Sequence, residues 1–126
     1  MPLAAAMSSS LARVLVVEDE PHVAAVLHDA LIDLGYAVQV AVNGAEALRL
    51  VPLYRPDVVL LDLALPNMPG DIVLGQLRLA DPNLPVIIVT GNADIELARG
   101  AFDYVAKPFD LEILARILAA ALVYRG

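Results

Sequence analysis

The stretch VVLLDLALPNMPG, residues 58–70, decides the fold. Its first four residues are branched and apolar, and the proline and glycine that follow bound the run. Such a run is typical of a strand buried on both faces of a parallel sheet. Asp62 closes it, so its carboxylate lies where a central strand ends and a loop begins, the edge at which open α/β sheets bind ligands. Because an isolated carboxylate beside an apolar core is costly, Asp62 needs a cation or a function.

Acidic residues follow a second apolar run. Val14–Val17 is succeeded at once by Glu18, Asp19 and Glu20. If the two strands are neighbours, several carboxylates meet at one sheet edge, and a cation has to offset their repulsion. Mg²⁺ suits this place because it prefers carboxylate oxygens, a backbone carbonyl and retained waters. Glu20 is interpreted as a solvated loop acid, and the same interpretation stays open for Glu18.

Two further strand ends carry a hydroxyl and an amine. The run 86–89 ends in Thr90, and residues 103–106 lead into Lys107 and Pro108. Taken alone, Thr90 is an ordinary β-branched strand residue and Lys107 a solvated loop lysine. Together with the acids, each at the end of a strand, they form a specific pattern.

The motifs VLVVEDE (14–20), VVLLDLALPNMPG (58–70), VIIVTG (86–91) and GAFDYVAKPF (100–109) together resemble the receiver domain of two-component response regulators. That domain is the phosphoacceptor fed by histidine kinases. The resemblance runs from about Arg13 to Tyr124. It implies a flavodoxin-like, doubly wound α/β fold with a five-stranded parallel sheet in the order 2-1-3-4-5, which puts the first and third strands side by side.

The resemblance also implies which residues do the chemistry. Asp62 is expected to be the nucleophile that accepts the phosphoryl group. Mg²⁺ is the expected cofactor, held by Asp19, Asp62 and the backbone carbonyl of Ala64, with Glu18 contributing through water. The metal offsets repulsion between the nucleophile and the phosphoryl oxygens.

Three more positions match the family pattern. Lys107 is expected to donate to the phosphoryl group and Thr90 to supply a hydroxyl, while Pro108, which follows a cis bond in the family, helps to aim the lysine. Thr90 and Tyr104 are expected to form the switch. Tyr104 is alternatively a half-exposed tyrosine of an edge strand, for which strand propensity suffices.

The chain organisation is read as five β-α repeats, with residues 1–10 as a disordered tail and 11–126 as one receiver domain. Apolar spacing predicts helices, of which the second is disrupted at its last turn by Pro52. The expected helices are Pro21–Leu34, Gly44 to about Val51, Asp71–Leu79 and Leu111 to about Tyr124. The expected strands are 14–17, 37–41, 58–62, 86–90 and 104–106.

One segment departs from the family. Seventeen positions separate Thr90 from Lys107, fewer than the family spacing by roughly one and a half helical turns. Residues 92–100 therefore leave room for only a shortened fourth helix, which puts the usual output surface in doubt.

The last helix is unusually apolar. Between Leu111 and Val123 only Glu112 and Arg116 are charged, and they can pair at i,i+4. A second apolar face indicates a covered surface, such as a homodimer partner or a following domain. The alternative is scattered exposed alanine and valine, which are normal on protein surfaces.

Composition excludes several classes of function. The net charge of −7 argues against direct nucleic-acid binding by this domain. The absence of cysteine fits a reducing cytoplasm, and no apolar run approaches the ~18 residues of a membrane span.

The favoured function is a phosphoacceptor signalling domain that catalyses only its own phosphorylation and dephosphorylation. Its partner would be a histidine kinase or a phosphotransfer protein. A pseudo-receiver, which binds partners without phosphorylation, is one alternative. A haloacid-dehalogenase-like phosphatase is the other, but that family carries a second aspartate two residues after the first, where this chain has Ala64.

Overall fold

The computed structural model describes residues 11–65, 67–91, 101–107 and 110–125, apart from the side chains of Thr90 and Arg125. Strands and helices alternate along most of this length. In chain order the elements are β1 (Arg13–Val17), α2 (Pro21–Asp33), β2 (Ala37–Ala41), α3 (Gly44–Tyr54), β3 (Val58–Asp62), α4 (Gly70–Ala80), β4 (Val86–Thr90), β5 (Asp103–Ala106) and α5 (Leu111–Arg125).

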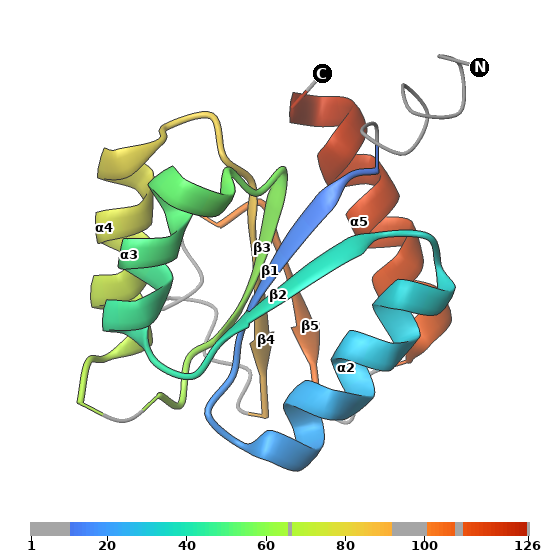
Figure 1. Cartoon of the computed structure of the whole chain (residues 1–126), viewed down its shortest axis with the longest axis horizontal. Helices are drawn as coiled ribbons and strands as arrows, with labels where there is room; N and C mark the ends of the chain where they lie inside the picture. Colours follow the sequence, from blue (N-terminus) through green and yellow to red (C-terminus); the bar gives the residue numbers. More distant parts are fainter. Residues whose placement is uncertain (1–10, 66, 92–100, 108–109, 126) are drawn as a thin grey trace.

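The five strands form one parallel sheet in the order β2-β1-β3-β4-β5. Figure 1 shows α3 and α4 on one face of this sheet and α2 and α5 on the other. The flavodoxin-like, doubly wound fold predicted from the sequence is therefore confirmed, including the central β1–β3 pair. The predicted shortening of a helix within 92–100 lies outside the described residues.

The core divides into two layers because alternate residues of a strand point to opposite faces. One layer packs against α3 and α4, and its strand residues are Leu15, Val17, Ala41, Val59, Leu61, Val86 and Ile88. The other packs against α2 and α5, and its strand residues are Val14, Val16, Val58, Leu60, Ile87, Val89 and Val105. Both faces of the three central strands are thus apolar, as their unbroken hydrophobic runs predict.

The predicted end of α3 at about Val51 is wrong. The helix continues through Pro52 to Tyr54 and ends at Arg55, whose left-handed backbone (φ 54°) lets its N–H donate to the Val51 carbonyl at 3.0 Å. Proline removes only one helical hydrogen bond so close to the end. Burial of Val51 and packing of Tyr54 against the core offset that loss.

The other helix boundaries agree with the sequence prediction to within a residue or two. Gly35, with φ +96°, follows the C-terminus of α2 as a glycine in the left-handed region often does. Within the part of the chain that the structure describes, no helix has both the length and the apolar character needed to span a membrane.

Candidate functional site

Two buried acids lie side by side at the carboxyl edge of the sheet. Val17 of β1 pairs with Leu61 of β3, so Glu18, which follows β1, and Asp62, the last residue of β3, reach the edge at the same level. Glu18 is 2% exposed and Asp62 is 5% exposed. The Glu18 N–H donates to the Ala41 carbonyl at 3.0 Å, which ties this turn of the chain to β2.

Lys107 joins the two acids. Its Nζ donates to Glu18 Oε1 and to Asp62 Oδ2, each at 3.1 Å. Thr90 pairs with Ala106 at the end of the β4–β5 ladder, and Lys107 follows directly. The register of four strands therefore delivers the lysine to carboxylates that are far away in the sequence.

Electrostatics in this cluster follow from burial. Burial is the largest effect on Glu18 and raises its pKa, and the neighbouring Asp62 raises it further. Hydrogen bonds from the Glu20 N–H and from Lys107 lower the pKa of Glu18, but the net result is a raised pKa. Burial lowers the pKa of Lys107, but its hydrogen bonds to Asp62 and Glu18 and the charges of both acids raise it more, so the net pKa is raised. Lys107 is therefore a firmly protonated cation between two buried carboxyl groups.

Glu18, Asp19 and Asp62 form a set of possible metal ligands. One carboxylate oxygen from each lies within 4.8 Å of the others. Asp19 is exposed, so the cluster opens to solvent on its side. Three hard oxygen donors with a solvent-facing side suit Mg²⁺, which keeps several of its waters. Lys107 is the only cation in the described residues that contacts these acids, and it leaves them with net negative charge.

The loop after β3 orients Asp62. Asp62 Oδ1 accepts a hydrogen bond from the Ala64 N–H at 2.9 Å, so both carboxylate oxygens have donors. Further along, Gly70 packs so closely on Leu63 that an added Cβ would lie 2.6 Å from the Leu63 Cα. The loop is therefore folded back tightly beside the carboxylate.

Three other residues that the sequence predicted for the site are not part of this acidic cluster as described. The backbone of Thr90 ends β4 as predicted, and its side chain lies outside the described part of the chain. Tyr104 lies on the edge strand β5 and is 39% exposed. Pro108 lies outside the described residues, so its role in aiming Lys107 stays a prediction.

The direct pairing of Glu18 with Lys107 was missed by the sequence prediction, which assigned Glu18 only a water-mediated contact. The β1–β3 register explains the pairing: with Val17 opposite Leu61, Glu18 lies level with Asp62, and Lys107 contacts both acids.

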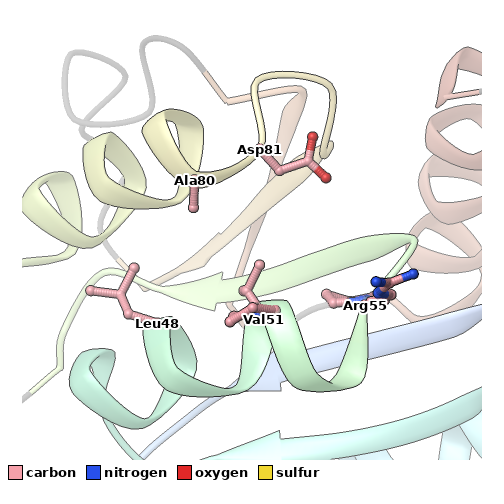
Figure 2. Close-up of a pocket in the computed structure, with 7 residues that line it drawn as sticks. Leu48, Val51, Arg55, Ala80 and Asp81 are labelled. Carbon is pink, nitrogen blue, oxygen red and sulfur yellow. The ribbon is translucent and has the colours of Figure 1, made fainter.

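A pocket lies at the opposite edge of the sheet. It has a volume of about 440 Å³ and lies between the C-terminal ends of α3 and α4. Figure 2 shows Leu48 and Val51 of α3 directed toward α4, with Arg55 and Asp81 at one end. Because these helices run back from the carboxyl edge, this pocket is separate from the acidic cluster.

Comparison with known proteins places this geometry in a family. The family model described as "Response regulator receiver domain" matches residues 14–119. The transcriptional regulatory protein KdpE of Mycobacterium tuberculosis is 46% identical over 113 residues, which cover 85% of this chain and 50% of KdpE. The regulatory protein AtoC of Escherichia coli K12 is 40% identical over 119 residues, which cover 90% of this chain and 26% of AtoC. The chain thus spans between a quarter and a half of the length of these relatives.

Solved structures of receiver domains have the same fold as this chain. A CheY-like receiver domain protein from Methanospirillum hungatei has a TM-score of 0.87 and 28% identity, with 92% of this chain and 97% of that chain covered. The response regulator TrrA of Thermotoga maritima, solved in complex with Mg(2+)-BeF, has a TM-score of 0.84 and 30% identity, with 89% and 100% covered. On the sequence match, the sheet order and these likenesses, the chain belongs to the response regulator receiver domain family of two-component systems.

Proposed function

We propose that Asp62 accepts a phosphoryl group from a phosphohistidine of a histidine kinase or phosphotransfer protein. The observation that carries this proposal is the contact between Asp62 and Lys107 at the carboxyl edge of the sheet, 3.1 Å from Oδ2 to Nζ. A buried carboxylate held beside a cation can approach an anionic phosphoryl group that an isolated carboxylate would repel. As a signalling domain, the protein would catalyse only its own phosphorylation and dephosphorylation.

The transfer needs no other covalent chemistry. An oxygen of Asp62 forms a bond to phosphorus while the bond from phosphorus to the imidazole nitrogen breaks. The electron pair leaves with that nitrogen, which takes a proton as the neutral imidazole is restored. Lys107 donates to the phosphoryl oxygens as they approach, and the Ala64 N–H holds the carboxylate in its orientation. Thr90 would add a hydroxyl donor from the end of β4.

Mg²⁺ is the proposed cofactor, held by Asp19, Asp62 and the Ala64 backbone carbonyl, with Glu18 acting through water. When bound, it would offset repulsion between the carboxylate and the phosphoryl oxygens. The proximity of the three carboxylates supports this assignment. Glu18 contributes in a second way, because it shares Lys107 with Asp62 and so fixes the lysine between the two acids.

Intact-mass analysis after treatment with acetyl phosphate and Mg²⁺ tests the proposal. One phosphoryl addition is expected on the parent and none on Asp62→Asn. Asp33→Asn, which removes an exposed carboxylate from α2, serves as the matched control and should label like the parent. A labelled peptide that does not contain residue 62 would overturn the assignment.

We further propose that phosphorylation changes self-association or partner choice through Thr90 and Tyr104, with α5 as the contact surface. The exposed residues Ile113 (48%) and Val123 (81%) support an association role for this helix, whereas Leu118 is fully buried and belongs to the core.

Sedimentation of the parent and of Val123→Glu, with and without beryllofluoride, tests the homodimer. The parent should associate more when beryllofluoride is present, and the variant should not. Leu79→Glu, which changes a leucine on α4 that is 79% exposed, is the control. A parent that stays monomeric in both states rules out a homodimer through α5.

A further inference from the structure

A groove lies between α2 and α5, on the face of the sheet opposite α3 and α4. It has a volume of about 380 Å³. Figure 1 shows the C-terminal part of α2 beside the start of α5, and residues of both helices line the groove. The lining residues are Ala30, Asp33 and Leu34 from α2 and Leu111, Glu112 and Ala115 from α5.

The chemistry of the groove is apolar below and acidic at the rim. Ala30 and Ala115 are small, so they leave space between the helices. Leu34 and Leu111 are 47% and 44% exposed although both line the groove. Leucine side chains that a fold leaves half exposed around one depression form a surface that gains from being covered.

The helix periodicity extends this surface along both walls. Val26, 44% exposed, lies one turn before Ala30 on the same face of α2. On α5, Ala119 lies one turn after Ala115 and is exposed. The apolar strip therefore continues beyond the groove for about one helical turn at each wall.

The two charged residues that line the groove, Asp33 and Glu112, are both acidic. Asp33 has no hydrogen bond or ion pair with another side chain in the described part of the chain. Glu112 is partly offset by Arg116, whose Nη2 lies 2.8 Å from Glu112 Oε1, but that pair is about three-quarters exposed and so weakly held. In a chain of net charge −7, this rim attracts a cationic partner.

We propose that this groove binds an amphipathic helix of another protein, with apolar side chains at i and i+3 or i+4 and lysine or arginine on both flanks. A trough between two helices with small residues at its base fits the apolar stripe of a third helix. The flanking cations would lie against Asp33 and Glu112. The acidic rim argues against a second copy of this acidic chain as the occupant.

This surface is distinct from the phosphoacceptor site. None of its lining residues belongs to the cluster of Glu18, Asp19, Asp62 and Lys107. On α2, Ala30 lies nine residues after Pro21, the first residue of the helix, or about 13 Å along it. Binding at the groove can therefore be measured in a protein whose Asp62 is intact and unphosphorylated, and its failure would leave the proposed phosphotransfer untouched.

The test uses a synthetic helical peptide of about 18 residues, long enough to be helical in water. It is built from leucine at helical spacing and lysine elsewhere, and a second peptide has glutamate in place of lysine. Amide chemical shifts of the labelled protein are followed as each peptide is added. The leucine-lysine peptide should give saturable shifts centred on Ala30, Leu34, Leu111 and Ala115, and the leucine-glutamate peptide should not.

Two pairs of variants separate the groove from general attraction to an acidic protein. Asp33→Lys should weaken binding about fivefold, the effect of reversing one exposed charge pair, while Asp71→Lys on α4 makes the same charge change elsewhere and should have little effect. Leu111→Ser should weaken binding about tenfold, while Leu79→Ser, at an exposed leucine outside the groove, should not. Equal weakening within either pair, shifts centred on another surface, or equal binding of the two peptides would overturn the proposal.

Discussion

Removal of the Lys107 charge tests the electrostatics of the acidic cluster most directly. Lys107→Met keeps most of the aliphatic stem and removes the ammonium group. Glu18 and Asp62, 2% and 5% exposed, then face each other without their shared cation. We therefore expect the metal-free variant to be clearly less stable than the parent.

The size of the effect follows from burial. Loss of one partner from a buried ion pair destabilises by about 3–5 kcal/mol. The Lys107 side chain is 26% exposed, and Asp19, whose carboxylate lies near those of Glu18 and Asp62, is exposed to water. Solvent therefore screens part of the interaction, and we expect a loss of about 2–3 kcal/mol in the free energy of unfolding. For a domain of this size that loss corresponds to a fall in Tm of about 8–12 °C.

Urea unfolding with excess EDTA, repeated at a saturating Mg²⁺ concentration, measures the prediction. A divalent cation replaces the missing positive charge, so Mg²⁺ should stabilise Lys107→Met more than it stabilises the parent. The gap narrows by the difference between the two stabilisations, so a variant whose Kd for Mg²⁺ is tenfold lower than that of the parent recovers about 1.4 kcal/mol at saturation. By the same thermodynamic cycle, the affinity of the variant for Mg²⁺ should rise.

Arg116→Met is the matched control, because it removes a cation from an exposed i,i+4 pair with Glu112. Its effect should stay within about 0.5 kcal/mol and should not depend on Mg²⁺. A loss below about 0.5 kcal/mol for Lys107→Met in EDTA, or a gap from the parent that Mg²⁺ leaves unchanged, would refute this reasoning.

Two further predictions concern Glu18 and the loop after Asp62. The folded-state pKa of Glu18 is raised above 4.5 mainly by burial, so its contribution to stability is present at low pH and is lost as pH rises through that folded pKa. In metal-free buffer, Glu18→Gln should therefore gain stability relative to the parent as pH rises from 4.5 to 7. A stability difference that does not depend on pH would contradict this. Gly70→Ala should destabilise by about 1–3 kcal/mol because its Cβ meets the Leu63 backbone, whereas Gly75→Ala, in the same helix with open space around it, should stabilise by about 0.5–1 kcal/mol. Thermal unfolding of both glycine variants would contradict the packing argument if they shifted Tm equally.

Much of this fold was predictable because its central strands are unambiguous. Apolar runs such as Val58–Leu61 are too short for buried helices and are closed by charged or polar residues, so both the strand and its functional end could be predicted. The position of Asp62 beside the first acidic group followed from the strand order that the family resemblance implied, and the β1–β3 pairing confirms it.

The inward-facing acid could not be predicted in the same way. Glu18 and Asp19 are adjacent, and the sequence does not say which one turns toward Asp62. The structure buries Glu18 and leaves Asp19 exposed, because the β1–β3 register and the hydrogen bond from the Glu18 N–H to Ala41 set the direction of the chain. The end of α3 was missed for a related reason: the tertiary packing of Val51 and Tyr54 outweighs the local effect of Pro52.

The strand order also has a consequence for synthesis on the ribosome. β1 lies between β2 and β3, so when the chain has emerged from the ribosome through Tyr54 only one of its two edges can be paired. The other edge, along Val14–Val17, stays unpaired until β3 is available. At about 5–20 residues per second, residues 55–62 take on the order of a second to emerge. A translational pause in that interval would lengthen the time for which an apolar strand edge is open to pairing with another nascent chain.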